Sequence, residues 1–255
     1  MKILLTGYKG FIGSHMLRAL EGHEVTTYEW GEEFPGVFGQ DWVIHIGANS
    51  STTEKDVDLV FKQNYDFSVR LFDECKTFGV NLQYASSASV YGLNKEFKET
   101  SPVDPRTPYA WSKYLFERYV QAHRGGNIVQ GFRYFNVYGP DGEEHKGDQA
   151  SPFYKFKHQA ELADRVKVFE GSNKYLRDFV HVERVIEIHK KFLDIPESGI
   201  YNIGTGEAIS FLDVAKKFSS KIVEIPMPVV LQSNYQEYTC ADMSKTNQML
   251  QKYHI

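Results

Sequence analysis

Cysteine is scarce in this chain, with only Cys75 and Cys240 among 255 residues. The two lie far apart in the sequence and suit a reducing compartment, although two thiols alone do not exclude a disulfide bridge. We expect both to be buried, unpaired packing residues.

Long apolar runs and an excess of one charge are also missing. No apolar stretch approaches the roughly 20 residues of a membrane span, and the start MKILLTGYKG has glycines where a signal peptide would continue its apolar core. The net charge is -4 and there is no long basic run, which argues against nucleic-acid or anionic-membrane partners. The histidines fall into no metal-ligand spacing, so we predict no metal site. A cytoplasmic protein with a small-molecule partner is expected.

A glycine-rich turn near the start is the first sign of chemistry. A short apolar strand at 3–5 is followed by Gly7, Gly10 and Gly13 and then by apolar residues at helical spacing. Glycines at this place let the backbone turn sharply and approach a pyrophosphate at the positive end of a helix. A plain tight turn is the alternative.

The stretch HEVTTYE predicts a second strand that ends at Glu29, about 20 residues after the glycines. A carboxylate there can accept hydrogen bonds from the adenosine ribose hydroxyls and repel a 2'-phosphate. The sequence therefore predicts NAD or NADP as cofactor and favours NAD. The alternative is a solvated loop acid, since Glu32 and Glu33 lie close by.

Strand and helix patterns alternate over the following residues. Apolar strands are predicted in the segments DWVIHIGANSSTTE, NLQYASSASVYG and IVQGFRYFNVYGP, and helices at 55–78 and 109–124. Alternation of this kind without an internal repeat predicts an α/β fold with a doubly wound parallel sheet.

Tyr109 and Lys113 are four residues apart on one predicted helix, so both side chains lie on the same face. A lysine ammonium beside a phenol favours the phenolate, which can act as a general base. The preceding strand ends in serines and can place Ser87 against the same substrate hydroxyl. Tyrosine and lysine at this spacing also occur on ordinary amphipathic helices.

Three segments together, GYKGFIGS, YASSASVYG and YAWSK, resemble the extended short-chain dehydrogenase/reductase family, which includes nucleotide-sugar epimerases. GANSSTTE, EHKGDQAS and VFEGSNKYLRDFVHV are similar to the ADP-heptose 6-epimerases within that family. The resemblance implies an isomerase that oxidises C6 of an ADP-heptose-like sugar with bound NAD(P) and returns the hydride with inverted configuration. It also implies a homo-oligomer.

The resemblance further implies two parts of the chain and a set of site residues. A Rossmann-like dinucleotide-binding domain would span 1–140 with 177–204, and a small C-terminal substrate-binding subdomain 141–176 with 205–255. Expected catalytic residues are Tyr109, Lys113, Ser87 and Lys146. Expected cofactor contacts are Gly7, Gly10, Phe11, Ile12, Gly13, Glu29, Ala48, Asn49, Lys113 and Val137. Expected substrate contacts are Asn136, Phe169, Glu170, Gly171, Ser172, Arg177 and Tyr235.

Alternatives stay open for two of these residues and for the activity. Lys146 could be a surface lysine in a glycine-containing turn, and Arg177 could pair with Asp178 or Glu183. The chain could instead be an epimerase for another nucleotide sugar, or a non-catalytic nucleotide-sugar-binding relative. A 4,6-dehydratase is disfavoured, because the serine strand carries no neighbouring carboxylate.

The sequence also predicts a missing piece. Only residues 30–41 separate Glu29 from the strand that begins at Trp42, and a crossover with a helix already takes about that many residues before any strand is added. We therefore predict that the third strand of the fold and its helix are deleted, and that the second strand lies at the sheet edge. Trp30, Phe34 or Phe38 would cover the adenine instead.

Overall fold

The centre of the computed structural model, which describes residues 1–51, 54–232 and 235–255, is a six-stranded parallel sheet. Its strand order is β2-β1-β3-β4-β5-β9. The strands are β1 (Lys2–Thr6), β2 (Glu24–Tyr28), β3 (Trp42–His45), β4 (Asn81–Ser87), β5 (Val129–Tyr134) and β9 (Gly199–Ile203).

Helices cover both faces of this sheet, so the predicted doubly wound α/β fold is confirmed. Ile3 and Leu5 pack with α1 (Phe11–Ala19) and α6 (Val182–Phe192). Leu4 points the other way and joins the cluster of α3 (Phe67–Phe78) and α4 (Pro108–Ala122). Alternate residues of a strand face opposite sides, which is why a strand covered on both sides is apolar throughout.

The expected third strand is absent, as the spacing predicted. Residues 29–41 form neither strand nor helix. β2 lies at the sheet edge, and β1 is flanked by β2 on one side and by β3 on the other. Val37 is fully buried and fixes the path of this loop. Trp30 and Phe34 pack edge-on against Phe67 at the start of α3.

The prediction for Phe38 is wrong. Its ring is 81% exposed and contacts Phe78 at the far end of α3, away from the carboxyl ends of the strands. Val37 occupies the buried position of the loop, and the neighbouring side chain is consequently turned outward. Only Trp30 of the three candidate aromatic residues lines a cavity beside Glu29.

Both predicted long helices form. The first runs through α2 (Val57–Phe61), a π-helical turn (Lys62–Asp66) and α3 without a break. The second is α4, which begins at Pro108 after Thr107, whose hydroxyl accepts a hydrogen bond from Ala110 N at 3.1 Å. Both cysteines are free, but only Cys75 is buried, and Cys240 is half-buried, contrary to expectation.

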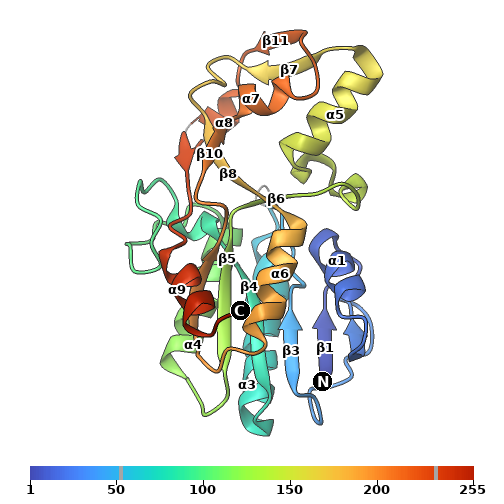
Figure 1. Cartoon of the computed structure of the whole chain (residues 1–255), viewed down its shortest axis with the longest axis vertical. Helices are drawn as coiled ribbons and strands as arrows, with labels where there is room; N and C mark the ends of the chain where they lie inside the picture. The colour runs from blue at the N-terminus through green and yellow to red at the C-terminus, as the bar shows by residue number, and fades with distance from the viewer. Residues whose placement is uncertain (52–53, 233–234) are drawn as a thin grey trace.

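Smaller elements lie beyond the carboxyl ends of the strands, toward which β1 and β3 point in Figure 1. β8 pairs with β6, β10 and β12, and β7 pairs with β11. The bounds are β6 (Asn136–Tyr138), β7 (Val166–Phe169), β8 (Leu176–His181), β10 (Ala208–Ser210), β11 (Ile222–Ile225), β12 (Tyr238–Thr239), α5 (Pro152–Ala163), α7 (Phe211–Lys216) and α8 (Val229–Gln232), with 3-10 turns at Ala88–Tyr91 and Glu144–Gln149. The last helix, α9 (Ser244–Lys252), instead packs beside β9 of the central sheet (Figure 1). The predicted boundaries of the two domains stay a prediction.

Among the described residues, no helix combines the length and apolar character needed to cross a membrane. The same residues contain no group of three His, Cys, Asp or Glu side chains that could hold a metal ion.

Candidate active site

The glycine turn opens the amino end of α1 toward a cleft. A Cβ on Gly13 would lie 1.9 Å from the Gly7 carbonyl oxygen, and one on Gly7 would lie 2.4 Å from Gly47 Cα. Glycine at these positions therefore lets β1, β3 and α1 approach closely. Gly10 caps α1 without any side-chain hydrogen bond, which leaves the first helical N–H groups for an anion. The turn fits the pyrophosphate of a dinucleotide.

Glu29 lies at the end of β2, where it lines both the cleft and a smaller hollow of about 240 Å³ beside Trp30. Its carboxylate accepts hydrogen bonds from Lys9 N and Trp30 N, each at 3.2 Å. Glu32 adds a second carboxylate here, paired with Lys9 Nζ at 2.7 Å. Two acids at this place suit ribose hydroxyls and disfavour a 2'-phosphate.

Asn64 of the π-helical turn ties the cofactor side of the cleft to the catalytic helix. Its amide oxygen accepts a hydrogen bond from Asn49 N at 2.7 Å, and its amide nitrogen donates to Asn49 O at 2.9 Å and to Ser112 Oγ at 3.2 Å. Ser112 Oγ in turn donates to Tyr109 O at 2.7 Å. The loop after β3 and the start of α4 are thus held in one arrangement.

Tyr109, Lys113 and Ser87 meet at the carboxyl end of β4. Burial raises the pKa of Tyr109, and a hydrogen bond with the Ser87 hydroxyl acts in the opposite direction. Lys113 Nζ donates to Ala85 O at 2.9 Å and lies 5.8 Å from the centre of the Tyr109 ring. Burial lowers the pKa of Lys113 to about 8. Burial therefore sets the direction of the Tyr109 pKa, which is opposite to the lowering expected beside Lys113.

A buried ion pair lies directly behind these residues. Arg133 of β5 donates from Nε and Nη2 to the two carboxylate oxygens of Glu117, at 2.9 and 2.6 Å. Ser86 Oγ donates to the same carboxylate at 2.6 Å. Glu117 follows Lys113 by one helical turn, so the pair connects α4, β4 and β5 under the cleft.

The cleft has a volume of about 650 Å³ and gathers most of the predicted site. Lys146 faces the same space as the glycine turn and Tyr109, so it is not a solvent-exposed loop lysine. The predicted residues that line the cleft are Gly7, Gly10, Phe11, Ile12, Gly13, Glu29, Ala48, Asn49, Ser87, Tyr109, Lys113, Asn136, Val137 and Lys146.

A second hollow of about 380 Å³ adjoins the cleft through Ala150 and Pro152, which line both. Three predicted substrate contacts line it: Phe169, Ser172 and Tyr235. Among the described residues, the buried Ser172 Oγ has no hydrogen-bond partner, which suits a polar ligand group.

Glu170, Gly171 and Arg177 line neither cavity. Glu170 is exposed, and Gly171 forms a turn at φ 77° in which Lys174 N donates to its carbonyl oxygen at 2.8 Å. The structure thus brings neither the side chains of Glu170 and Arg177 nor Gly171 to the walls of the two cavities. Their role as substrate contacts stays a prediction.

Arg177 is buried behind the second hollow, between the rings of Phe211 and Tyr235 at 5.5 and 5.3 Å. It donates to the carbonyl oxygens of Leu176 and Gln236. Burial lowers the pKa of the guanidinium.

The alternative ion pairs for Arg177 do not form. The Asp178 carboxylate accepts from the backbone N–H groups of Thr205, Gly206 and Ala241 at 2.8, 2.9 and 3.0 Å, and Glu183 pairs with His181. Within the part of the chain that the structure describes, Arg177 has no carboxylate partner. A buried cation without an acid favours an anionic ligand.

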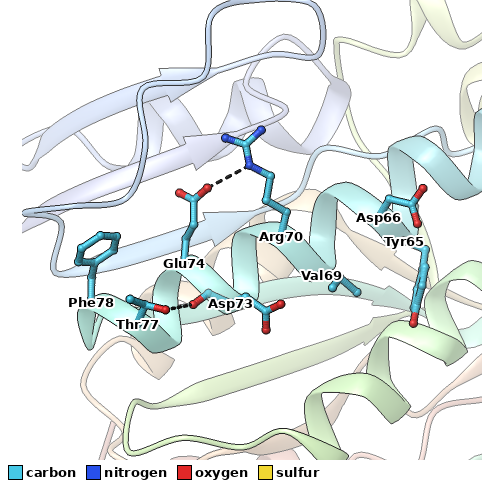
Figure 2. Close-up of a pocket in the computed structure, with 8 residues that line it drawn as sticks. All are labelled: Tyr65, Asp66, Val69, Arg70, Asp73, Glu74, Thr77 and Phe78. Carbon is cyan, nitrogen blue, oxygen red and sulfur yellow. Dashed lines mark hydrogen bonds and ion pairs between the residues drawn. The ribbon is translucent and has the colours of Figure 1, made fainter.

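A further hollow of about 580 Å³ lies on the outer face of α3, and none of the predicted site residues lines it. Figure 2 shows its residues along one face of the helix, with an ion pair between Arg70 and Glu74 and a hydrogen bond from Thr77 to the Asp73 carbonyl. It does not contribute to the candidate active site.

A glycine turn, an acid at the end of β2 and a Ser–Tyr–Lys group now lie in one cleft. The sequence pattern of the NAD dependent epimerase/dehydratase family matches residues 3–204. The chain belongs to this family. Membership of this family confirms three predictions: the α/β fold, an epimerase, which is an isomerase, and NAD as the cofactor.

Individual proteins that are similar to this chain are also epimerases. ADP-L-glycero-D-manno-heptose-6-epimerase from Brachyspira hyodysenteriae is 40% identical over 215 residues, which make up 80% of this chain and 67% of that protein. The crystal structure of the Helicobacter pylori enzyme of the same name superposes with a TM-score of 0.87 at 28% identity, over 98% of this chain and 90% of its own. The UDP-glucose 4-epimerase of Thermus thermophilus, in complex with NAD, has a TM-score of 0.80 at 26% identity, over 97% and 92% of the two chains.

Sequence reasoning missed several residues that position the site. They are three buried polar side chains: Asn64, Glu117 and Glu143. Asn64 bonds Ser112, Glu117 pairs with Arg133, and Glu143 pairs with Lys146. The available signal was a polar residue on an otherwise apolar helix face, as for Glu117 one turn after Lys113. That signal does not name the partner.

Proposed function

We propose that this chain inverts C6 of an ADP-heptose-like nucleotide sugar by transient oxidation and re-reduction. The observation that carries this proposal is one cleft that joins a dinucleotide turn, the Ser87–Tyr109–Lys113 group and Lys146. The 40% identity to a protein named as an ADP-heptose 6-epimerase supports the choice of sugar.

In this proposal Tyr109 takes the proton of the C6 hydroxyl, and Ser87 hydrogen-bonds the same oxygen. Lys113 holds the cofactor ribose and stabilises negative charge on the phenol. NAD held by the glycine turn, Glu29 and Lys113 would supply reversible hydride transfer at C6. Lys146, on the segment after β6, exchanges a proton with the oxygen when the sugar presents its other face.

The second hollow is the proposed place of the ADP part of the substrate. Arg177 is a buried cation without an acid partner, and Ser172 Oγ lacks a partner among the described residues. A diphosphate in the hollow would accept a hydrogen bond from the Ser172 hydroxyl, and the Arg177 guanidinium behind the wall would attract its negative charge. Phe169 and Tyr235 supply apolar and aromatic surface beside them.

The test is the fate of hydrogen at C6. We expect the purified chain with NAD to convert ADP-heptose deuterated at C6 into its epimer with the deuterium retained, because the hydride returns within one bound complex. Mass spectrometry and NMR of the product measure this. Loss of the label to solvent rejects the mechanism for this substrate.

A panel of nucleotide hexoses separates the alternatives. Conversion of a UDP-hexose but not of ADP-heptose would show an epimerase for another sugar. Nucleotide-sugar binding without turnover and without NAD binding in calorimetry would show a non-catalytic relative.

Trp30 provides a test of how the cofactor is bound beside β2, where the third strand is missing. In the proposal its ring covers the adenine in place of the missing strand, since it lines the hollow beside Glu29 and is 42% exposed. We expect Trp30→Ala to weaken NAD binding roughly tenfold, about 1.4 kcal/mol, through lost aromatic contact. Phe38→Ala, in the same loop but facing Phe78, should leave NAD affinity unchanged. Isothermal titration calorimetry measures both, and equal affinities for the two variants would contradict the assignment.

The assembly state and location belong to the proposal as well. We infer a homo-oligomer that pairs through α3 and α4. Support comes from Trp111 of α4, which is 44% exposed, and from the outer face of α3 shown in Figure 2. Light scattering measures the assembly state. The cytoplasmic location stays a prediction from the sequence.

A further inference from the structure

Lys146 is held by a carboxylate that the sequence did not single out. Glu143 is fully buried, and its Oε2 accepts from Lys146 Nζ at 3.0 Å. The same carboxylate accepts from Ser151 N at 2.6 Å and from Ser151 Oγ at 2.7 Å. A carboxylate removed from water is retained only when charged or donor groups satisfy it. Lys146 supplies the charge, and Ser151 supplies the neutral donors.

The other side of the Lys146 ammonium faces an aromatic ring. Its Nζ lies 4.7 Å from the centre of the Phe11 ring, at the first position of α1. The ring face attracts a cation and offers it no hydrogen-bond acceptor. Lys146 is therefore held between the amino end of α1 and the start of α5, with its side chain 20% exposed to the cleft.

Backbone geometry fixes the spacing of the two groups. Lys146 N donates to Glu143 O at 3.0 Å across one 3-10 turn, so residues three apart lie above each other. Gly147 follows at φ 49° and turns the chain toward Ser151. The turn thereby brings the Lys146 amine and the Ser151 donors onto one carboxylate.

We propose that Glu143 is the positioning residue of Lys146, which fixes the amine in the cleft. This inference rests on the proposed function for the role of Lys146 in turnover. The contact itself does not depend on it. Ser151 would then anchor Glu143, and the start of α5 with it.

The test compares Glu143→Gln with Glu144→Gln, which removes the same charge from the adjacent, exposed residue. We expect Glu143→Gln to lower kcat roughly 10- to 100-fold, part of what a proton-transfer group supplies, with little change in KM. Glu144→Gln should keep wild-type values. Equal kcat for the two variants would overturn the proposal.

Limited acylation provides a readout that needs no substrate. Acetic anhydride acylates lysine amines that are accessible and not held by a partner, and peptide mass spectrometry measures the labelled fraction of Lys146. Glu143→Gln should raise this fraction severalfold over wild type, and Glu144→Gln should not. If no nucleotide sugar is turned over by the wild type, the proposed function fails, and the labelling still decides the Glu143 contact. Unchanged labelling in Glu143→Gln rejects that contact.

Ser151→Ala distinguishes positioning from mere anchoring. It removes one hydrogen bond to Glu143 and the hydroxyl that caps α5, but it leaves the carboxylate beside Lys146. We expect a much smaller loss of kcat than in Glu143→Gln and unchanged Lys146 labelling. If Ser151→Ala loses as much turnover as Glu143→Gln, the carboxylate serves the fold of this segment and the proposal is wrong.

Discussion

Tyr109→Phe is expected to lower epimerase turnover about a thousandfold, because it removes the hydroxyl that exchanges the proton with the sugar. NAD binding should stay near the wild-type affinity, since Lys113 and the glycine turn are untouched. Steady-state kinetics and calorimetry measure the two quantities. The loss should appear in kcat rather than in KM, as expected for a group that acts in the transition state.

Tyr114→Phe is the matched control for this substitution. Tyr114 lies on the same helix, contacts Trp111 and packs against the core but does not line the cleft, so the same chemical change is made outside the cleft. We expect it to retain most of the turnover. Turnover in Tyr109→Phe within tenfold of the Tyr114→Phe value would mean that another group carries the proton.

Glu117→Gln is expected to destabilise the fold by about 3–5 kcal/mol, because it leaves the buried Arg133 guanidinium without its counter-charge. Glu117 and Arg133 are 1% and 3% exposed, so water cannot replace the lost partner. The Arg133 Nη1 atom already lacks a partner among the described residues, which adds to the expected cost. Urea unfolding followed by circular dichroism gives the free energy of unfolding.

A double variant shows whether the ion pair itself or the stranded charge dominates. Glu117→Met with Arg133→Met replaces both charges with apolar side chains, and it should be clearly more stable than Glu117→Gln. Ser86 Oγ loses its acceptor in the double variant, so full recovery is not expected. A double variant that is less stable than Glu117→Gln would show that the ion pair contributes net stability.

Local chemistry made much of this protein predictable. The three glycines of the first turn, the Tyr109–Lys113 spacing and the alternation of apolar strands with amphipathic helices are encoded within short windows of sequence. The missing third strand was also predictable, because the 30–41 segment is too short to hold it. Steric and length constraints of this kind do not depend on the rest of the fold.

Other features depended on contacts between distant residues. Phe38 was misplaced because the burial of Val37 decides which way its neighbour points. The pKa of Tyr109 departed from expectation because the fold buries the phenol, and burial raises its pKa. Arg177 does not pair with Asp178, because the Asp178 carboxylate accepts hydrogen bonds from the backbone N–H groups of three other residues. These are Thr205, Gly206 and Ala241.

The sequence alone determined the sheet, the dinucleotide turn, the catalytic tyrosine and lysine candidates and the shortened cofactor side, since each follows from residue types at short spacing. Only the tertiary structure decided which charges are paired. It placed Glu117 on Arg133 and Glu143 on Lys146, and it left Arg177 facing no acid among the described residues. The physical reason is that the energy of a buried charge depends on every group that surrounds it in space, and those groups come from elements far apart in the chain.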